Sequence, residues 1–113
     1  MMPCRGEIWL VNLNPVKRNN EVGKVRPVVV FQADALNKSD YPTTIIFPLT
    51  TSLIDDSEPL RMRLTKRTKL EADSDILVAQ IRAIDNSRFI EKLAVLKDDE
   101  IAKLKKLFEE ITT

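Results

Sequence analysis

A charged residue stands directly before a hydrophobic run in the first third of the chain. Arg26 and Pro27 precede Val28–Phe31, a run that is typical of a buried strand. A guanidinium stays charged at physiological pH and presents several donors in a fixed fork, which suits a phosphate group. We therefore predict that Arg26 binds a phosphate, and that the proline and the strand behind it hold the side chain in place.

The segment before Arg26 contains further charged groups, namely Lys17, Arg18, Glu21 and Lys24. The simplest interpretation is a solvated surface loop, because charges between strands are usually exposed. The alternative is a reactive loop in which an acid lies close to an arginine. Glu21 could act as a base only if burial raised its pKa, whereas the nearby guanidinium lowers it.

Two other stretches also allow two interpretations. Residues 61–69, "RMRLTKRTK", carry five basic side chains and no acid. They could protect an edge strand from aggregation, or they could form a track for phosphates with strongly salt-dependent affinity. Thr50, Thr51 and Ser52 end an apolar run, and their hydroxyls could either bond nearby backbone in a turn or donate to a phosphate oxygen.

Composition limits the possible chemistry. The chain has 113 residues, 43% of them hydrophobic, and a net charge of +1, which indicates one globular domain over residues 1–113 and no bulk attraction to polyanions. The single cysteine, Cys4, excludes an internal disulfide and favours the cytoplasm. No stretch approaches the roughly 20 apolar residues of a membrane span. There is no histidine, so catalysis must use other groups.

The hydrophobic pattern predicts several short strands and one long helix. Alternating or β-branched runs indicate strands at residues 6–13, 25–33, 43–50, 61–65, 75–85 and 92–96, and residues 33–39 could hold one helical turn. Residues 96–111 have helical periodicity, with one apolar face made by Ile101, Leu104, Leu107, Phe108 and Ile111. Asp98 is the expected cap. This order predicts a mainly β protein, a small bent barrel with a C-terminal α-helix packed across it.

Four blocks in this order resemble the MazF/PemK family of toxins: "RGEIWLVNLNP", "EVGKVRPVVV", "FPLTTS" and "AQIRAIDNSRF", followed by a helix that begins with acids. The resemblance implies an SH3-like barrel of the CcdB/MazF/PemK type that forms a homodimer. It also implies a metal-independent, cofactor-free endoribonuclease that cuts single-stranded mRNA at short sequences and inhibits translation. A MazE/PemI-like antitoxin would restrain the toxin, and the toxin–antitoxin complex would bind DNA.

The resemblance also assigns roles to particular residues. Arg26 and Thr50 match the catalytic arginine and threonine of the family, with Thr51 as the alternative threonine, and Glu21 matches the acid of the preceding loop. The matching segments also contain candidates for holding RNA, some of which could instead build the dimer: Arg5, Lys17, Lys24, Thr51, Ser52, Gln80, Arg82 and Ser87. No residue is expected to bind a metal.

One position departs from the family pattern. Members commonly carry an acid before the "Q-x-R-x-I-D" stretch, and here that position is Ala79. Its absence moves the expected general base to Glu21, or else leaves a slow or inactive RNA-binding homologue. A gyrase poison of the CcdB type is a further alternative, although the chain ends in "EEITT" and lacks the Trp-Gly-Ile terminus of those toxins.

Overall fold

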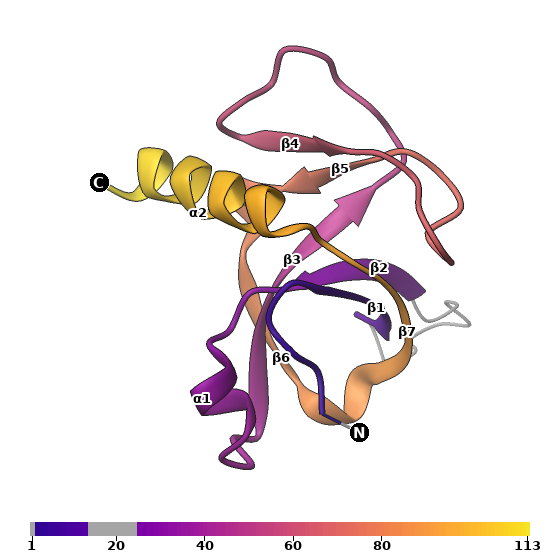
Figure 1. The fold of residues 1–113 in the computed structure, drawn as a ribbon, viewed down its shortest axis with the longest axis vertical. Helices are drawn as coiled ribbons and strands as arrows, with labels where there is room; N and C mark the ends of the chain where they lie inside the picture. Colours follow the sequence, from indigo (N-terminus) through magenta and orange to yellow (C-terminus); the bar gives the residue numbers. More distant parts are fainter. Residues whose placement is uncertain (1, 14–24) are drawn as a thin grey trace, which may run out of the picture.

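The computed structural model describes residues 2–13 and 25–113, which form a mainly antiparallel sheet and a C-terminal helix (Figure 1). The elements are β1 (Glu7–Asn12), β2 (Val25–Val30), α1 (Asp34–Asn37), β3 (Thr43–Thr50), β4 (Arg61–Leu64), β5 (Ser74–Leu77), the 3₁₀ turn η1 (Val78–Gln80), β6 (Arg82–Asp85), the 3₁₀ turn η2 (Asn86–Arg88), β7 (Phe89–Val95) and α2 (Asp98–Thr112). The predicted class, mainly β with a C-terminal helix, is confirmed.

The predicted strand at 75–85 is in fact two strands, β5 and β6, separated by η1. Both pair with β3, but at different places: β5 lies beside Leu49 and Thr50, whereas β6 lies beside residues 43–46. The chain must therefore move along β3 between the two ladders. The turn η1 makes this shift, and Leu60 O accepts hydrogen bonds from the N–H groups of Val78 and Ala79 there.

The sheet is not closed into the barrel that the sequence predicts. Its strand order is β4-β5-β3-β2-β1-β7, with β6 beside β3, so in the described part of the chain β4 and β7 are the two ends. The β4–β5 connection reaches β7 through one backbone hydrogen bond, 3.0 Å from Lys69 N to Leu93 O. A single bond in a connection does not pair the strands, because a ladder needs successive backbone contacts.

Hydrophobic side chains form two clusters on opposite faces of β1 and β2. Ile8 and Val29 belong to the cluster under α2, whereas Val11 and Val28 belong to the other. In α2, Leu104 and Leu107 are buried, and Ile101, Phe108 and Ile111 pack against the first cluster, which confirms the predicted apolar face. No helix among residues 2–13 and 25–113 is long and apolar enough to cross a membrane.

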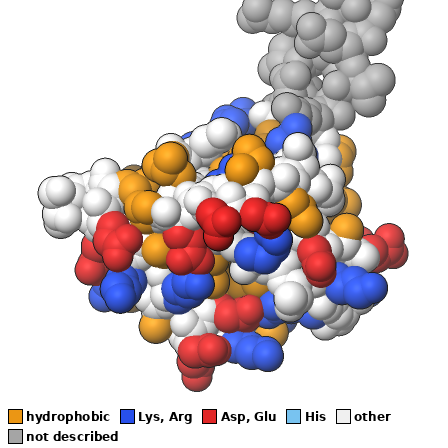
Figure 2. All heavy atoms as spheres, turned by 90° about the horizontal axis from the view of Figure 1, so that it is seen from above, with side chains coloured by type: hydrophobic (Ala, Val, Ile, Leu, Met, Phe, Trp, Pro, Cys, Tyr) orange, Lys and Arg blue, Asp and Glu red, His pale blue; other side chains and the backbone are white. Residues whose placement is uncertain are grey.

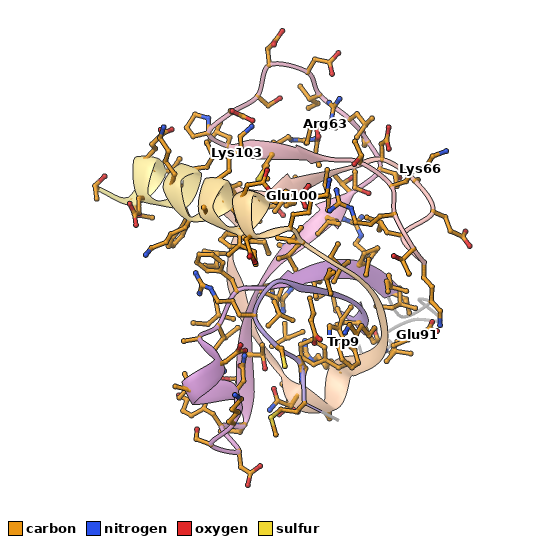
Figure 3. The ribbon with its side chains drawn as sticks, in the orientation of Figure 1. Trp9, Arg63, Lys66, Glu91, Glu100 and Lys103 are labelled. Atoms are coloured by element: carbon orange, nitrogen blue, oxygen red, sulfur yellow. The ribbon has the colours of Figure 1, made fainter. Side chains whose placement is uncertain are left out.

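The start of α2 differs by one residue from the prediction. The N-cap is Lys97 rather than Asp98, and the Glu100 carboxylate accepts a hydrogen bond from Lys97 N at 2.8 Å. Asp98 instead lies in the first helical turn with two more acids, where negative charge favours the exposed N–H groups. Glu100 also pairs with Arg67 of the β4–β5 connection, so the helix is tied to the sheet edge. Figure 3 labels Glu100 at the start of α2.

Candidate functional site

Arg26 and Thr50 lie at the same end of the β2–β3 ladder. Val28 pairs with Pro48, Arg26 comes two residues before Val28, and Thr50 comes two residues after Pro48. Because successive side chains of a strand alternate between faces, Arg26 shares the face of Val28, and Thr50 shares the face of Pro48. Continuing the register by two residues sets Arg26 opposite Thr50 on one face of the sheet.

Pro27 explains why the ladder between β2 and β3 begins only at Val28. Proline has no N–H to donate, and its ring fixes the backbone beside Arg26. On the other side of β2, Pro27 is in register with Leu10 and Arg26 with Val11. The backbone of Arg26 is thus held from the β1 side, while its other side, toward Thr50, has no ladder partner among residues 2–13 and 25–113.

The Arg26 side chain is half-buried, and no described carboxylate pairs with it. Its backbone partner, Val11, is fully buried. A guanidinium beside an apolar cluster keeps a partly desolvated charge, which strengthens its attraction for an anion. This environment suits binding of a phosphate.

Thr50 is half-buried at the end of β3, and its hydroxyl oxygen accepts a hydrogen bond from Ser52 N at 3.1 Å. This is the local turn contact that the sequence allows for such a residue. Because the oxygen is used as an acceptor, the hydroxyl proton remains available to donate. Thr51 and Ser52 are exposed, and Thr51 lines a hollow of about 560 Å³ whose wall also includes Pro27 and Leu10.

The strand β7 begins beside the same end of the sheet. Val11 of β1 pairs with Arg26 of β2 on one side and with Phe89 of β7 on the other. The turn η2 comes directly before Phe89, so one strand, β1, lies between the end of η2 and Arg26. Ser87 in η2 is exposed, and its backbone N–H donates a hydrogen bond to Asp85 Oδ1 at 2.8 Å. Arg88 donates to Leu13 O at 3.3 Å. Arg88 was not among the residues predicted from the sequence. It stands directly before the strand β7, and a basic residue before a hydrophobic run is the pattern that indicated Arg26.

The other predicted RNA contacts are more dispersed. Gln80 and Arg82 are exposed, and Arg82 pairs with Ile46, four residues from Thr50 along β3 or roughly 13 Å at the usual strand rise. Arg5 donates to Phe31 O at 2.6 Å and its guanidinium lies 4.3 Å from the centre of the Phe31 ring, so this side chain has a packing role. Lys17, Glu21 and Lys24 lie outside the described residues.

Four of the five basic side chains in residues 61–69 pair with acids. Arg61 and Arg63 contact Asp75, Arg67 contacts Glu100 and Lys69 contacts Glu91. Seen from the side of β4, acidic and basic side chains lie interspersed (Figure 2). Since β4 is an end strand of the sheet, the stretch fits a charged, protected edge better than a phosphate track.

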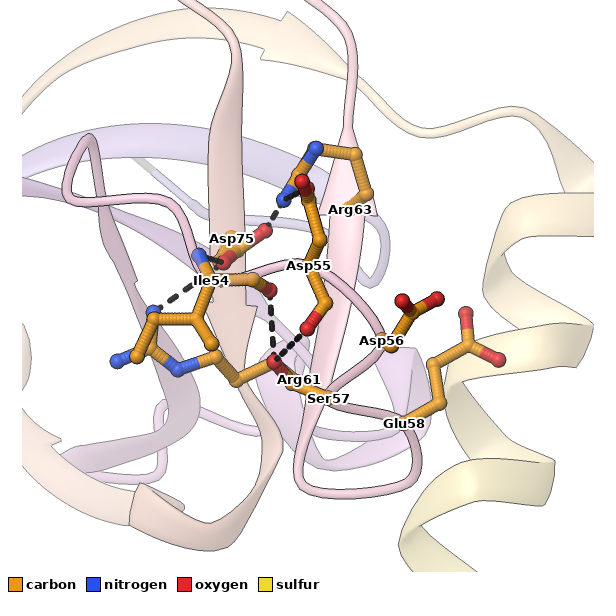
Figure 4. A pocket seen from close by; sticks show the side chains of 8 residues that line it. All are labelled: Ile54, Asp55, Asp56, Ser57, Glu58, Arg61, Arg63 and Asp75. Carbon is orange, nitrogen blue, oxygen red and sulfur yellow. Dashed lines mark hydrogen bonds and ion pairs between the residues drawn. The ribbon is translucent and has the colours of Figure 1, made fainter.

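Asp75 is the buried centre of this charged edge, at 1% exposure (Figure 4). Burial raises the pKa of Asp75, but hydrogen bonds from Arg63, from the N–H of Ile54 and from Arg61 outweigh that effect and hold the pKa below its ordinary value. The carboxylate is therefore ionised at neutral pH. It pairs in backbone register with Thr50, which brings the charged edge next to the end of β3.

Comparison with known proteins identifies the family and several relatives of this chain. Residues 4–112 match the model of the family described as PemK-like, MazF-like toxin of type II toxin-antitoxin system. The Endoribonuclease MazF of Staphylococcus saprophyticus is 38% identical over 104 residues, which is 91% of this chain and 85% of that protein.

Solved structures have the same fold. The MazE-MazF structure (Form-II) from Deinococcus radiodurans has a TM-score of 0.81 and 22% identity, covering 99% of this chain and 96% of that one. An endoribonuclease in complex with its cognate antitoxin from Mycobacterial species has a TM-score of 0.77 and 14% identity, covering 97% and 94%. The chain therefore belongs to the PemK-like, MazF-like toxin family of type II toxin–antitoxin systems.

Proposed function

We propose that this chain is the toxin of a type II toxin–antitoxin system and acts as an endoribonuclease on single-stranded RNA, mRNA above all, at short sequences. Membership of the toxin family and the identity shared with an endoribonuclease over most of both chains support the activity. The observation that carries the assignment of the site is the position of Arg26 and Thr50, on one face at one end of the β2–β3 ladder.

RNA can be cut without an external nucleophile. The ribose 2′-oxygen attacks the adjacent phosphorus and forms a new P–O bond, the bond to the 5′-oxygen breaks, and the products carry a 2′,3′-cyclic phosphate and a 5′-hydroxyl. The protein must orient the strand and stabilise the negative charge that develops on the phosphoryl oxygens. The Arg26 guanidinium would neutralise that charge, and the Thr50 hydroxyl would donate a second hydrogen bond to the same group.

The general base is a separate question. Ala79 is exposed in η1 and its methyl group cannot accept a proton, so the position at which the family resemblance leads us to expect an acid supplies none here. We assign the role to Glu21 of the β1–β2 connection. If Glu21 does not act, the second candidate function is that of a slow or inactive RNA-binding homologue.

Partners follow from the same family. The neighbouring structures in which a MazF toxin or an endoribonuclease is bound to its antitoxin support an antitoxin partner of the MazE/PemI kind for this chain. We also propose a homodimer, action in the cytoplasm, and DNA binding by the toxin–antitoxin complex.

Incubation of the purified protein with a long single-stranded RNA in EDTA tests the function. Wild type should produce fragments with 5′-hydroxyl ends, and Arg26→Ala should lose about 100-fold or more in rate, as is typical when one well-placed donor is removed. Since no described acid pairs with Arg26, the melting temperature of this variant should stay near that of wild type.

Two matched variants test the register. Thr50→Ala should lose most of the activity, whereas Thr51→Ala should lose much less, and the reverse result would move the site by one residue. RNA binding without cleavage by wild type would favour the inactive homologue, and inhibition of gyrase without cleavage would favour a poison of the CcdB type.

A further inference from the structure

The chain segment that follows Thr50 is held by a single buried carboxylate. Asp75 lies on β5 in backbone register with Thr50, and its Oδ2 atom accepts hydrogen bonds from Ile54 N at 2.9 Å and from Arg61 Nη1 at 3.2 Å. Arg61 Nη1 also donates to Ser52 O at 2.8 Å. The carboxylate therefore fixes the backbone at Ser52, through Arg61, and at Ile54 directly.

A second arginine completes the network. Arg63 Nε donates to Asp75 Oδ1 at 2.7 Å, and Arg63 Nη2 donates to Asp55 Oδ1 at 2.8 Å (Figure 4). Both Asp75 oxygens thus have partners, and no described side-chain polar atom that is buried lacks one. Asp55 is 83% exposed, so its contact with Arg63 lies at the solvent side of the network and contributes little.

The network is directed at the Thr50 hydroxyl. Ser52 N donates to Thr50 Oγ1 at 3.1 Å, and Ser52 O is the atom that Arg61 holds. A fixed Ser52 therefore keeps one lone pair of the threonine oxygen occupied, which leaves the hydroxyl proton to be donated elsewhere. Without Arg61 and Asp75, the described side-chain contacts left to exposed residues 51–54 would be this turn contact and the hydrogen bond from Ser57 Oγ to Ile54 O at 2.6 Å.

Stability alone is a weak explanation for this arrangement. Burying the Asp75 carboxylate costs desolvation free energy that its partly exposed arginine partners offset only in part, and well-packed hydrophobic residues often stabilise a fold equally well. What charged groups with fixed geometry provide is a defined orientation. Here the oriented segment begins at the residue that the proposed function places at the phosphate.

We propose that Asp75, acting through Arg61 and Ser52, is a positioning residue that orients the Thr50 hydroxyl toward the scissile phosphate. This inference rests on the proposed function, in which Thr50 donates a hydrogen bond to that phosphate. Asp75 itself touches neither the RNA nor the reacting atoms. Its effect should therefore appear in the rate of cleavage rather than in the affinity for RNA.

Single-turnover cleavage of a long single-stranded RNA, with protein in excess, separates the two quantities. Asp75→Asn should lower the maximal rate roughly 10- to 100-fold, the cost typical of a small misplacement of a catalytic group, while half-saturation changes less than about 3-fold. Asp55→Asn is the matched control, because it makes the same chemical change at the exposed end of the network and should cleave like wild type.

A double variant distinguishes positioning from general damage. If Asp75 acts through the Thr50 hydroxyl, Asp75→Asn should cause little further loss in a Thr50→Ala background. Multiplied losses in the double variant would overturn the proposal. Should Asp75→Asn fail to fold, Arg61→Gln applies the same test, because it releases Ser52 O while Asp75 keeps its contacts with Arg63 and Ile54.

The two proposals fail in different ways. Full activity of Thr50→Ala and Arg26→Ala would refute the proposed site, and with it the positioning role. Loss of activity in those variants together with wild-type rates for folded Asp75→Asn and Arg61→Gln would refute the positioning role alone.

Discussion

The ion pair between Arg67 and Glu100 should contribute more to stability than an ordinary surface pair. Arg67 is in the β4–β5 connection, Glu100 is in the first turn of α2, and the two guanidinium nitrogens Nη1 and Nη2 each donate to one carboxylate oxygen. Only 16% of the arginine side chain and 18% of the glutamate side chain are exposed. We expect this pair to fasten α2 to the edge of the sheet.

The magnitude follows from geometry and exposure. Each hydrogen bond to a charged group contributes about 1.5–3 kcal/mol to stability. The total for the two bonds is reduced because both ions lose part of their hydration when the pair forms, and because water still screens the part of the pair that is exposed. We expect a coupling free energy of about 2 kcal/mol. For a domain of this size, 1 kcal/mol corresponds to roughly 4 °C in melting temperature, so breaking the pair should lower it by about 8 °C.

A double-mutant cycle measures this coupling directly. Arg67→Met, Glu100→Gln and the double variant are unfolded in urea, and the cycle cancels the contacts that Arg67 makes with Thr65. The control cycle uses Lys103 and Glu58, which join α2 to the β3–β4 connection at 2.7 Å but are 51% and 46% exposed.

The control pair should show a coupling below about 0.5 kcal/mol. A coupling at Arg67 and Glu100 no larger than that would refute the reasoning.

The stability that this pair contributes should also depend on pH. Because the hydrogen bond from Arg67 holds the pKa of Glu100 below its ordinary value, the contribution of the pair to stability is present above about pH 4.3 and is lost as the pH falls through the folded-state pKa.

Three other variants test the fold. Leu104→Ala removes a fully buried side chain under α2 and should lower the free energy of unfolding in urea by about 3 kcal/mol; a loss below 1 kcal/mol would contradict its place in the core. Gly6→Ala should lower the melting temperature, because Gly6 has φ of 86° and a Cβ would lie 2.5 Å from Ile101 Cδ1; an unchanged temperature would contradict that contact. Asp75→Asn should destabilise the fold at pH 7, because the wild-type carboxylate is ionised there and its lowered pKa contributes to stability. As the pH falls below about 4, the wild-type carboxylate takes up a proton and this contribution is lost, so the urea midpoints of the two proteins should converge. A difference between the midpoints that does not change with pH would be inconsistent with an ionised carboxylate.

Local patterns in the sequence were sufficient to predict most elements. The predicted strand at 43–50 coincides with β3, and the apolar face of the last helix is the buried face of α2. These predictions succeed because a side-chain period of two or of 3.6 is a property of consecutive residues. The apolar run at 75–85 was misread as one strand because nothing local records that β3 offers two separate pairing sites to it.

The sequence by itself determined that an arginine and a proline stand before a buried strand, and that hydroxyls end another. Only the tertiary structure decided that Arg26 and Thr50 share one face, and that Asp75 and Glu100 neutralise basic residues which, read alone, resemble a phosphate track. The reason is physical: residue type and spacing set local conformation, whereas strand register and long-range ion pairs arise from the packing of segments distant in the chain.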